Sequence, residues 1–490
     1  MNEVDYIILP CKFMRCPQNR ILLVNEVGEY LYLTEEEFEG LASYQLEPDS
    51  RIYYDLKSKH FLSDSERSLP SQVNLLATKY RTKKAYLRHF TSLHMVVVTL
   101  RCNQICNYCH ASSKDDTARS YDMDVDTAKK VVDMIFESPS PSIKIEFQGG
   151  EPLLNFTIVE EIVKYAEKTN KAKRKNLSFV LCTNLTLINQ DILEYLKKHT
   201  VLISTSLDGP KALHDANRIM RCGGSSYDKV IDKLKLTRAV MGNENVSALM
   251  TTTNNNLGNL NQIIDEYVEL GFQGVFLRSL NPYGYAKTGH NEKLQYDMDD
   301  FVSAYKKAIE YIITLNQKGA YFVEYFATIL LTRILTPFST GFMDLQSPAG
   351  VGILGAIYDF NGDVYPSDEG RMLAAMGDSH FRLGNVKRNT HAELFYSPLL
   401  QKIIHNSCVE IVPSCHSCAY QQFCGTDPIR AYSQQNDKNY FGCIPTSEFC
   451  KKYKQIISYF MDMIRENDQA VMDVFWSWVT RRKYNEVRIK

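Results

Sequence analysis

The sequence predicts an α/β protein whose centre is a partial (β/α)6 barrel of the TIM type, with a small module before it and a cysteine-rich domain after it. Six strand-like runs each precede a helix-like segment between residues 94 and 335. The runs are almost continuously apolar, as parallel strands covered by helices are. Right-handed crossovers curl such strands into a barrel and place its chemistry at their C-terminal ends.

The expected strands are residues 94–100, 143–149, 177–184, 201–209, 246–253 and 274–282. The segments between them, such as DTAKKVVDMIFES, repeat apolar residues at helical spacing. At roughly 150 residues per domain, a chain of 490 residues holds two to four domains. We expect an N-terminal module at 1–85, the barrel at 90–335, the cysteine-rich domain at 340–455 and a C-terminal helix at 456–490.

The N-terminal module contains a hairpin and a capped helix. The hairpin turns at Val27-Gly28, and Thr34 then begins a helix as its N-cap. Glu37 follows Thr34 by three residues, which is the spacing of a capping box. The pattern is typical of a winged-helix type of module.

Charge and hydropathy exclude several kinds of partner. Lys and Arg number 56 against 57 Asp and Glu, so the chain has no overall field that attracts nucleic acid or an anionic membrane. No basic groove with interleaved aromatic residues is evident. No apolar run approaches the roughly 20 residues that span a bilayer, and the first residues lack the marks of a signal peptide. We expect a cytoplasmic protein that binds neither nucleic acid nor membrane.

The cysteines give the first chemical signal. There are 13, and three of them, Cys102, Cys106 and Cys109, follow the first strand in one loop. Clustered cysteines in a reducing compartment indicate metal or redox chemistry. Three thiolates cannot close a structural zinc site, but they can hold three irons of a cubane and leave the fourth iron open. The alternative is a zinc site that takes His110 as its fourth ligand.

This C-x3-C-x2-C spacing, with Tyr108 before the last cysteine, resembles the signature of the radical S-adenosylmethionine (SAM) superfamily. The resemblance implies a four-iron, four-sulfur cluster whose open iron binds SAM. It also implies reductive cleavage of SAM to a 5′-deoxyadenosyl radical that removes a hydrogen atom from the substrate. In such enzymes the cofactor carries the difficult chemistry and the protein positions it.

Further residues match the SAM-binding positions of that superfamily. After the second strand, Gln148, Gly149, Gly150 and Glu151 lie in a GGEP motif, where glycines allow close approach and Glu151 can accept a hydrogen bond from an ammonium group. The alternative is a simple glycine turn. The other positions implied by the resemblance are Tyr108, Asn184, Ser206, Asp208, Arg218 and Leu280.

A second cysteine group lies near the C-terminus. Cys415-x2-Cys418-x5-Cys424 resembles the SPASM extension of radical SAM peptide maturases, which carries two auxiliary clusters. Ser367 and Pro428 stand where the pattern has ligands of the first. The resemblance therefore implies one auxiliary four-iron cluster, held by Cys415, Cys418, Cys424 and Cys450. Cys443 competes with Cys450 for the last place, and a structural zinc ion is the alternative for the site.

Asp368 is the candidate catalytic residue. It occupies the slot of an aspartate that acts as general base in sulfatase-maturing relatives. Such a base would take the proton that is released when a substrate radical is oxidised. The alternative is an aspartate of a turn after Pro366.

Over nearly its whole length the chain resembles the maturases of the His-Xaa-Ser system, through segments such as GDVYPSDEGRML and VFWSWVT. The resemblance implies a ribosomally made precursor peptide, with a leader and a core that carries His-Xaa-Ser repeats, and a crosslink such as a cyclophane carbon–carbon bond. It implies an external reductant such as flavodoxin or ferredoxin. The N-terminal module would bind the leader along a strand edge or cap the barrel. The alternatives are a sulfatase-maturing type of protein oxidase, a nucleic-acid modifier, and a non-enzymatic iron–sulfur or zinc redox protein.

Overall fold

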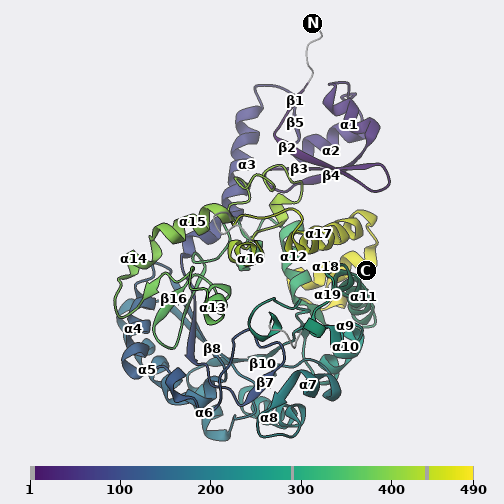
Figure 1. Cartoon of the computed structure of the whole chain (residues 1–490). Coiled ribbons are helices and arrows are strands. Elements are labelled where there is room, and N and C mark those ends of the chain that lie inside the picture. The colour runs from purple at the N-terminus through teal and green to yellow at the C-terminus, as the bar shows by residue number, and fades with distance from the viewer. Residues whose placement is uncertain (1–5, 288–291, 436–440, 489–490) are drawn as a thin grey trace.

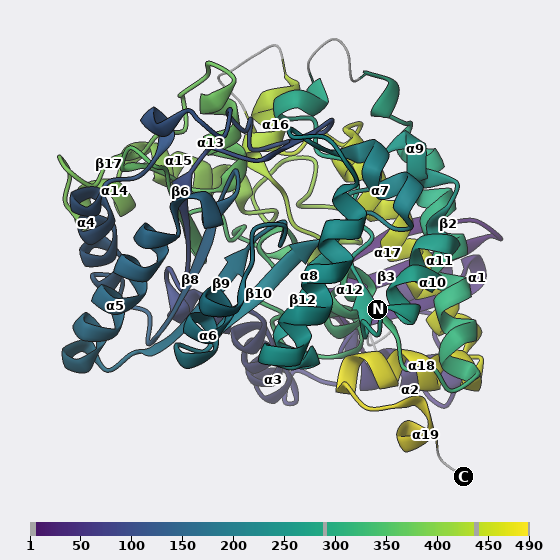
Figure 2. The ribbon, with the colours of Figure 1, turned by 90° about the horizontal axis from the view of Figure 1, so that it is seen from below.

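The protein is described by a computed structural model that covers residues 6–287, 292–435 and 441–488 (Figure 1). Its main sheet has eight strands, of which the barrel contributes five parallel ones in the order β12-β10-β9-β8-β6. The strands are β6 (Leu93–Thr99), β8 (Ser142–Gly149), β9 (Asn176–Cys182), β10 (Val201–Ser206) and β12 (Val246–Leu249). Helices α4 (Val125–Phe136), α5 (Phe156–Lys173), α6 (Gln190–Lys198) and α8 (Ser226–Met241) cover the outer face (Figure 2). The predicted α/β fold is confirmed.

In β8 and β9 the outer face is apolar, and the inner face carries polar side chains. In β8, Ile145 and Phe147 are fully buried in the core, whereas Glu146 and Gln148 line a cavity inside the barrel. In β9, Cys182 shares this inner face, because its thiol donates a hydrogen bond to the Glu146 Oε1 at 3.4 Å. The inner face can therefore carry chemistry, while the outer face packs on helices.

The prediction of a sixth strand at 274–282 is wrong for most of its length. Only Gly274–Val275 (β13) is a strand, and it pairs with Val323–Glu324 (β14) in a separate small sheet. The buried Glu324 carboxylate accepts hydrogen bonds from the Leu277 backbone N–H at 3.0 Å and the Tyr305 hydroxyl at 2.7 Å. The residues after Leu277 form a loop that brings Arg278, Ser279 and Asn281 to the inner cavity.

The cysteine-rich region extends the other edge of the sheet. Strand β15 (Gly355–Tyr358) runs parallel to β6, with Gly355 opposite Leu93 and Tyr358 opposite Val96. Strands β16 (Asp363–Tyr365) and β17 (Gly384–Asn385) continue the sheet in antiparallel fashion. The barrel and the cysteine-rich region thus share one continuous sheet.

The N-terminal module consists of strands β2 (Cys11–Cys16), β3 (Arg20–Asn25) and β4 (Tyr30–Thr34) with helices α1 (Glu35–Ala42), α2 (Arg51–Ser58) and α3 (Leu69–Lys83). The predicted capping box is confirmed, since Thr34 Oγ1 accepts from Glu37 N at 3.1 Å and Thr34 N donates to the Glu37 carboxylate at 2.7 Å. Lys84 forms an ion pair with Glu410 at 2.6 Å, so the module contacts the cysteine-rich region.

The C-terminal segment is three helices, and the first of them, α17 (Glu448–Glu466), spans the expected boundary at 455/456. It packs beside α11 (Met298–Gln317) (Figure 1). The remaining helices are α7 (Lys211–Asn217), α9 (Asn254–Leu257), α10 (Leu260–Glu269), α12 (Tyr325–Leu335), α13 (Asp368–Ala375), α14 (His391–Phe395), α15 (Pro398–Ser407), α16 (Pro428–Gln434), α18 (Gln469–Thr480) and α19 (Tyr484–Val487). Within the described ranges, no helix has the length and hydropathy needed to cross a membrane.

A buried ion pair anchors the loop after β6. The Arg101 side chain, 4% exposed, donates from Nε and Nη2 to the Asp122 carboxylate at 2.7 and 2.8 Å. It also donates to the carbonyl oxygens of Asp116 and Leu154. One guanidinium thus joins the start of the first cysteine loop to the segments before α4 and α5.

We predict that Asp122→Asn lowers the free energy of unfolding by about 3 kcal/mol, because the Arg101 guanidinium would stay buried without its counter-charge. Lys387→Gln removes an exposed pair with Asp124 and should cost less than about 1 kcal/mol. Urea unfolding of the two variants measures the difference. Equal effects would show that the Arg101–Asp122 pair does not anchor the loop.

Candidate active site

The three clustered cysteines lie at the C-terminal end of β6. Cys102 follows the strand, and Cys106 ends the short strand β7 (Gln104–Cys106). Strand β7 pairs with β11 (Arg218–Met220), so that Cys106 stands opposite Arg218. The pairing brings a cation from the end of α7 to the cysteine loop.

The three thiols share one largely buried space. Burial raises the pKa of Cys102 well above its ordinary value, and the thiols of Cys106 and Cys109 raise it further. Burial also raises the pKa of Cys106 to about 12, although the Arg218 guanidinium lowers it. Positively charged iron would stabilise the thiolates that this setting disfavours.

Asp208 organises the polar residues around the cysteine loop. Its fully buried carboxylate accepts hydrogen bonds from the Tyr108 hydroxyl at 2.6 Å and the Arg218 Nε at 3.1 Å. The Arg218 guanidinium lies 5.4 Å from the centre of the Tyr108 ring. Burial opposes the charge of Arg218, but Asp208 raises the pKa of that guanidinium well above its ordinary value. Asp208 therefore positions both side chains at the cysteine loop.

The glycine motif after β8 packs tightly against the loop after β6. Gly149 has φ of +138°, and Gly150 N donates to the Thr99 carbonyl oxygen at 2.9 Å. A Cβ on Gly150 would lie 2.2 Å from the Arg101 carbonyl oxygen. Position 150 therefore requires glycine, because the backbone of the loop after β6 leaves no space for a Cβ. A ligand bound close to this backbone would add the same requirement.

Glu151 is fully buried and has three protein partners. Its carboxylate accepts from Leu153 N, the Thr183 hydroxyl and Asn184 N at 2.7–3.0 Å. Burial raises its pKa to about 7, which these hydrogen bonds oppose. In this structure Glu151 orders the loop after β9, and its contact with an ammonium group stays a prediction.

The other predicted SAM contacts also lie at this end of the barrel. The Asn184 amide donates to Asn103 Oδ1 at 2.9 Å and lies 3.9 Å from the Cys102 sulfur. Leu280 packs against Tyr108 in a small cluster. Ser206 ends β10 opposite Leu249, and the Gln148 amide donates to Glu146 at 2.5 Å. The fold thus brings together residues that lie far apart in the chain, from Cys102 to Leu280.

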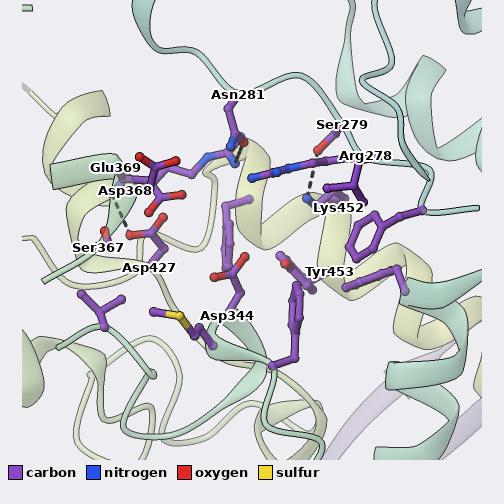
Figure 3. Close-up of a pocket in the computed structure, with 18 of the residues that line it drawn as sticks. Arg278, Ser279, Asn281, Asp344, Ser367, Asp368, Glu369, Asp427, Lys452 and Tyr453 are labelled. Carbon is purple, nitrogen blue, oxygen red and sulfur yellow. Dashed lines mark hydrogen bonds between the residues drawn. The ribbon is translucent and has the colours of Figure 1, made fainter. Parts of the chain in front are cut away.

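A cavity of about 390 Å³ lies inside the barrel, between the sheet and the cysteine-rich region (Figure 3). Asp368, Glu369 and Asp427 gather on one side, and Arg278 and Lys452 face them. Aromatic residues complete the wall: Phe276, Tyr283, Phe301, Tyr305, Phe326, Phe342, Phe449 and Tyr453. The cavity can hold a side chain with both an apolar and a charged part.

Glu369, Asp427 and Lys452, which line the cavity, have shifted pKa values. Burial, and then Asp427, raises the pKa of Glu369 to about 8. Burial, and then Asp344, raises that of Asp427 to about 6. Burial, and then Arg430, lowers the pKa of Lys452 to about 7. Asp368 is the first residue of α13 and accepts from Arg371 Nε at 3.3 Å.

The structure gives a role to each residue that replaces an expected cysteine. Ser367 is the N-cap of α13, and its hydroxyl accepts from Gly370 N at 3.5 Å. Pro428 is the first residue of α16, whose N-cap Asp427 accepts from Ile429 N and Arg430 N. Both positions start a helix, which serine and proline favour.

Several cavity residues were not predicted from the sequence. Glu146 could have been found, since it precedes Gln148 by two residues in a strand and so shares its face. Arg278 and Asn281 lie in the loop after β13 and Asp344 lies in a short 3-10 turn, whereas Glu369, Asp427, Arg430 and Lys452 lie at the starts of α13, α16 and α17. Only the folded chain brings these to one cavity.

The barrel was compared with known protein families and with curated proteins. Residues 96–267 match the sequence model of the Radical SAM superfamily. A cysteine-type anaerobic sulfatase-maturating enzyme of Clostridium perfringens strain 13 is 26% identical over 366 residues, which are 73% of this chain and 93% of the relative. An uncharacterised protein of Methanocaldococcus jannaschii is 33% identical over 192 residues, 39% of this chain and 63% of that protein.

The barrel has the radical SAM fold. The solved structure of anSMEcpe with bound AdoMet, which is SAM, superposes with a TM-score of 0.65 at 20% identity and covers 79% of this chain and 98% of that one. SuiB of Streptococcus suis bound to the precursor peptide SuiA has a TM-score of 0.53 at 14% identity, over 90% and 98% of the chains. These likenesses show the shared fold.

The residues of the radical SAM domain fit the cofactors of its superfamily, a four-iron cluster and SAM. Burial disfavours the ionised form of the Cys102 and Cys106 thiols, and the positive charge of iron would stabilise it. Beside Arg218, Nε2 of His214 and Oδ1 of Asn217 are buried without a partner among the described residues. A polar ligand would satisfy such atoms. Among the described residues, no three His, Cys, Asp or Glu side chains form the site of a single metal ion.

We predict that Gly150→Ala lowers the affinity of the radical SAM domain for SAM at least tenfold. The new Cβ must displace the Arg101 or Leu100 carbonyl oxygen, which would lie at 2.2 and 2.5 Å. Gly258→Ala is the control, because its Cβ would meet nothing within 4 Å. Equilibrium dialysis with labelled SAM measures both. Unchanged affinity in Gly150→Ala would contradict the tight contact between the two loops.

Proposed function

We propose that this chain is a radical SAM enzyme that modifies a ribosomally made peptide, with a crosslink such as a cyclophane carbon–carbon bond as the product. One observation carries the proposal. The cysteine loop, with Arg218 and Tyr108 held by Asp208, follows β6, and β6 and β8 line a cavity that also has charged and aromatic side chains.

The residues at this end of the barrel divide the work of the cofactor site. Cys102, Cys106 and Cys109 would hold the cluster, which supplies the electron that cleaves SAM to methionine and a 5′-deoxyadenosyl radical. Arg218 and Ser206 would bind the polar groups of SAM, and Tyr108 with Leu280 would pack beside it. Asp208 keeps Arg218 and Tyr108 in one geometry, so that little ordering is left for the moment of binding.

Asp368 is proposed as the proton acceptor for the substrate. Among the cavity carboxylates in the described part of the chain, it alone forms an ion pair, with the buried Arg371. Burial raises the pKa of Glu369 above its ordinary value, so that its carboxyl group favours the protonated form. Arg371 would hold the Asp368 carboxylate in place while it takes the proton that is lost as the substrate radical is oxidised.

The substrate class is proposed from the relatives and the cavity together. SuiB is seen with a precursor peptide, and the Clostridium enzyme is named for sulfatase maturation. A sulfatase-maturing type of oxidation is therefore the second candidate function. The position of Asp368 supports this function and peptide crosslinking equally. Incubation with a sulfatase-derived peptide and with a His-Xaa-Ser precursor peptide separates the two, because only the true substrate changes mass.

The N-terminal module is proposed to bind the leader of that peptide. Strand β2 lies at one edge of the three-stranded sheet, where an extended peptide can add as a strand. Phe13 on β2 is 51% exposed and its ring lies 4.7 Å from that of Phe38. Leader binding would bring the core segment of the peptide to the barrel. The Lys84–Glu410 contact would let the same module also act as a structural cap.

We predict that the anaerobically reconstituted protein, reduced with dithionite, produces 5′-deoxyadenosine and methionine from SAM. Cys106→Ala should abolish the product, because one iron of the cluster loses its ligand. Cys222→Ala is the control, since that cysteine is exposed and outside both groups. Chromatography of the products measures the yield. If Cys106→Ala still forms 5′-deoxyadenosine, these thiols are not the cluster ligands.

We further predict that Asp368→Asn lowers the amount of modified peptide per 5′-deoxyadenosine at least about 100-fold, the scale of general-base catalysis. Asparagine keeps the hydrogen bond with Arg371 but cannot take a proton. SAM cleavage itself should persist, because Asp368 lies outside the cysteine loop. Asp363→Asn is the control, and mass spectrometry of a co-expressed precursor peptide gives the ratio. An unchanged ratio would exclude Asp368 as the base.

A further inference from the structure

Five cysteines, one more than a four-iron cluster needs, lie near one another in the cysteine-rich region. Cys415, Cys418 and Cys424 lie in the segment before α16, and Cys450 lies in the first turn of α17. The fifth is Cys443, which is buried at 8% exposure beside Cys450 at 9%. Cys443, Cys450 and Val412 form one packed cluster, and Cys415 packs against it.

Cys443 lies between two of the other thiols. Its thiol lies within hydrogen-bonding reach of both the Cys415 and the Cys450 sulfur. Cys418 and Cys424 each interact electrostatically with Cys415 and Cys450. All five sulfurs therefore belong to one site.

The backbones of Cys443 and Cys450 are fixed independently of each other. The Ser414 hydroxyl donates to the Cys443 carbonyl oxygen at 2.9 Å, next to Cys415 in the chain. Cys450 N donates to the hydroxyl of Ser447, the N-cap of α17, at 3.2 Å. Loss of either side chain thus leaves the other cysteine in place.

We propose that the auxiliary site is a five-thiol site in which Cys443 and Cys450 are interchangeable fourth ligands of one four-iron cluster. The inference rests on the auxiliary cluster of the proposed function. With Cys415, Cys418 and Cys424 as fixed ligands, either remaining thiol completes the set of four that a cubane takes. Cys443 also lines a cavity of about 520 Å³ that shares Asp427, Arg430 and Phe449 with the substrate cavity. An exchange between the two ligands would therefore occur beside the substrate.

The test uses the full chain with Cys102, Cys106 and Cys109 changed to alanine, so that only the auxiliary cluster remains. After anaerobic reconstitution this parent should hold about four irons. Cys443→Ala, Cys450→Ala and the double variant are compared before and after mild oxidation with ferricyanide. Iron analysis and electron paramagnetic resonance follow the cluster. Cys408→Ala is the control, because no other cysteine affects the Cys408 thiol.

Both single variants should keep all their iron, as the parent and the control do. The double variant should lose one iron in four and give a three-iron signal, since the iron without a thiolate leaves on oxidation. If one single variant behaves like the double variant, that cysteine is the fixed ligand and the proposal is overturned. If the double variant resembles the parent, neither cysteine is a ligand. A parent without iron, or with one zinc ion, refutes the auxiliary cluster itself but leaves the SAM-cleaving function intact.

Discussion

The ion pair between Asp208 and Arg218 is the interaction on which the candidate site depends. Asp208 has no exposed surface, and its charge is tolerated inside the protein because Arg218, Tyr108 and Asn217 donate hydrogen bonds to it. A buried ion pair of this kind gives definite geometry more than stability. Here it fixes β11 against β7, and hence the place of Cys106.

In the cysteine-rich region, the two positions at which an expected cysteine is absent lie at helix starts. Ser367 and Pro428 begin helices α13 and α16. The carboxyl groups beside them, Asp368 and Asp427, face the cavity, where a charged substrate group can meet them. The starts of these two helices therefore contribute to a polar wall of the cavity.

The shared sheet couples these two parts of the molecule. Since β15 pairs with β6, the strand that leads to the cysteine loop is held on both sides, by β8 and by the cysteine-rich region. The cavity takes residues from both, so its shape depends on that pairing. The N-terminal module adds a third body, which meets the cysteine-rich region through Lys84 and Glu410.

The sequence by itself determined the α/β class, five of the six strands, the helices of the barrel and the capping box at Thr34. These follow from local periodicity and capping, which neighbouring residues decide. It also identified the cysteine loop, because the spacing of Cys102, Cys106 and Cys109 can be read from the sequence without knowledge of the fold. Only the tertiary structure decided that 274–282 is mainly a loop, that Arg278, Glu369 and Lys452 share a cavity, and that Cys443 lies between Cys415 and Cys450. Such groupings depend on long-range packing, which brings together residues that no local pattern connects.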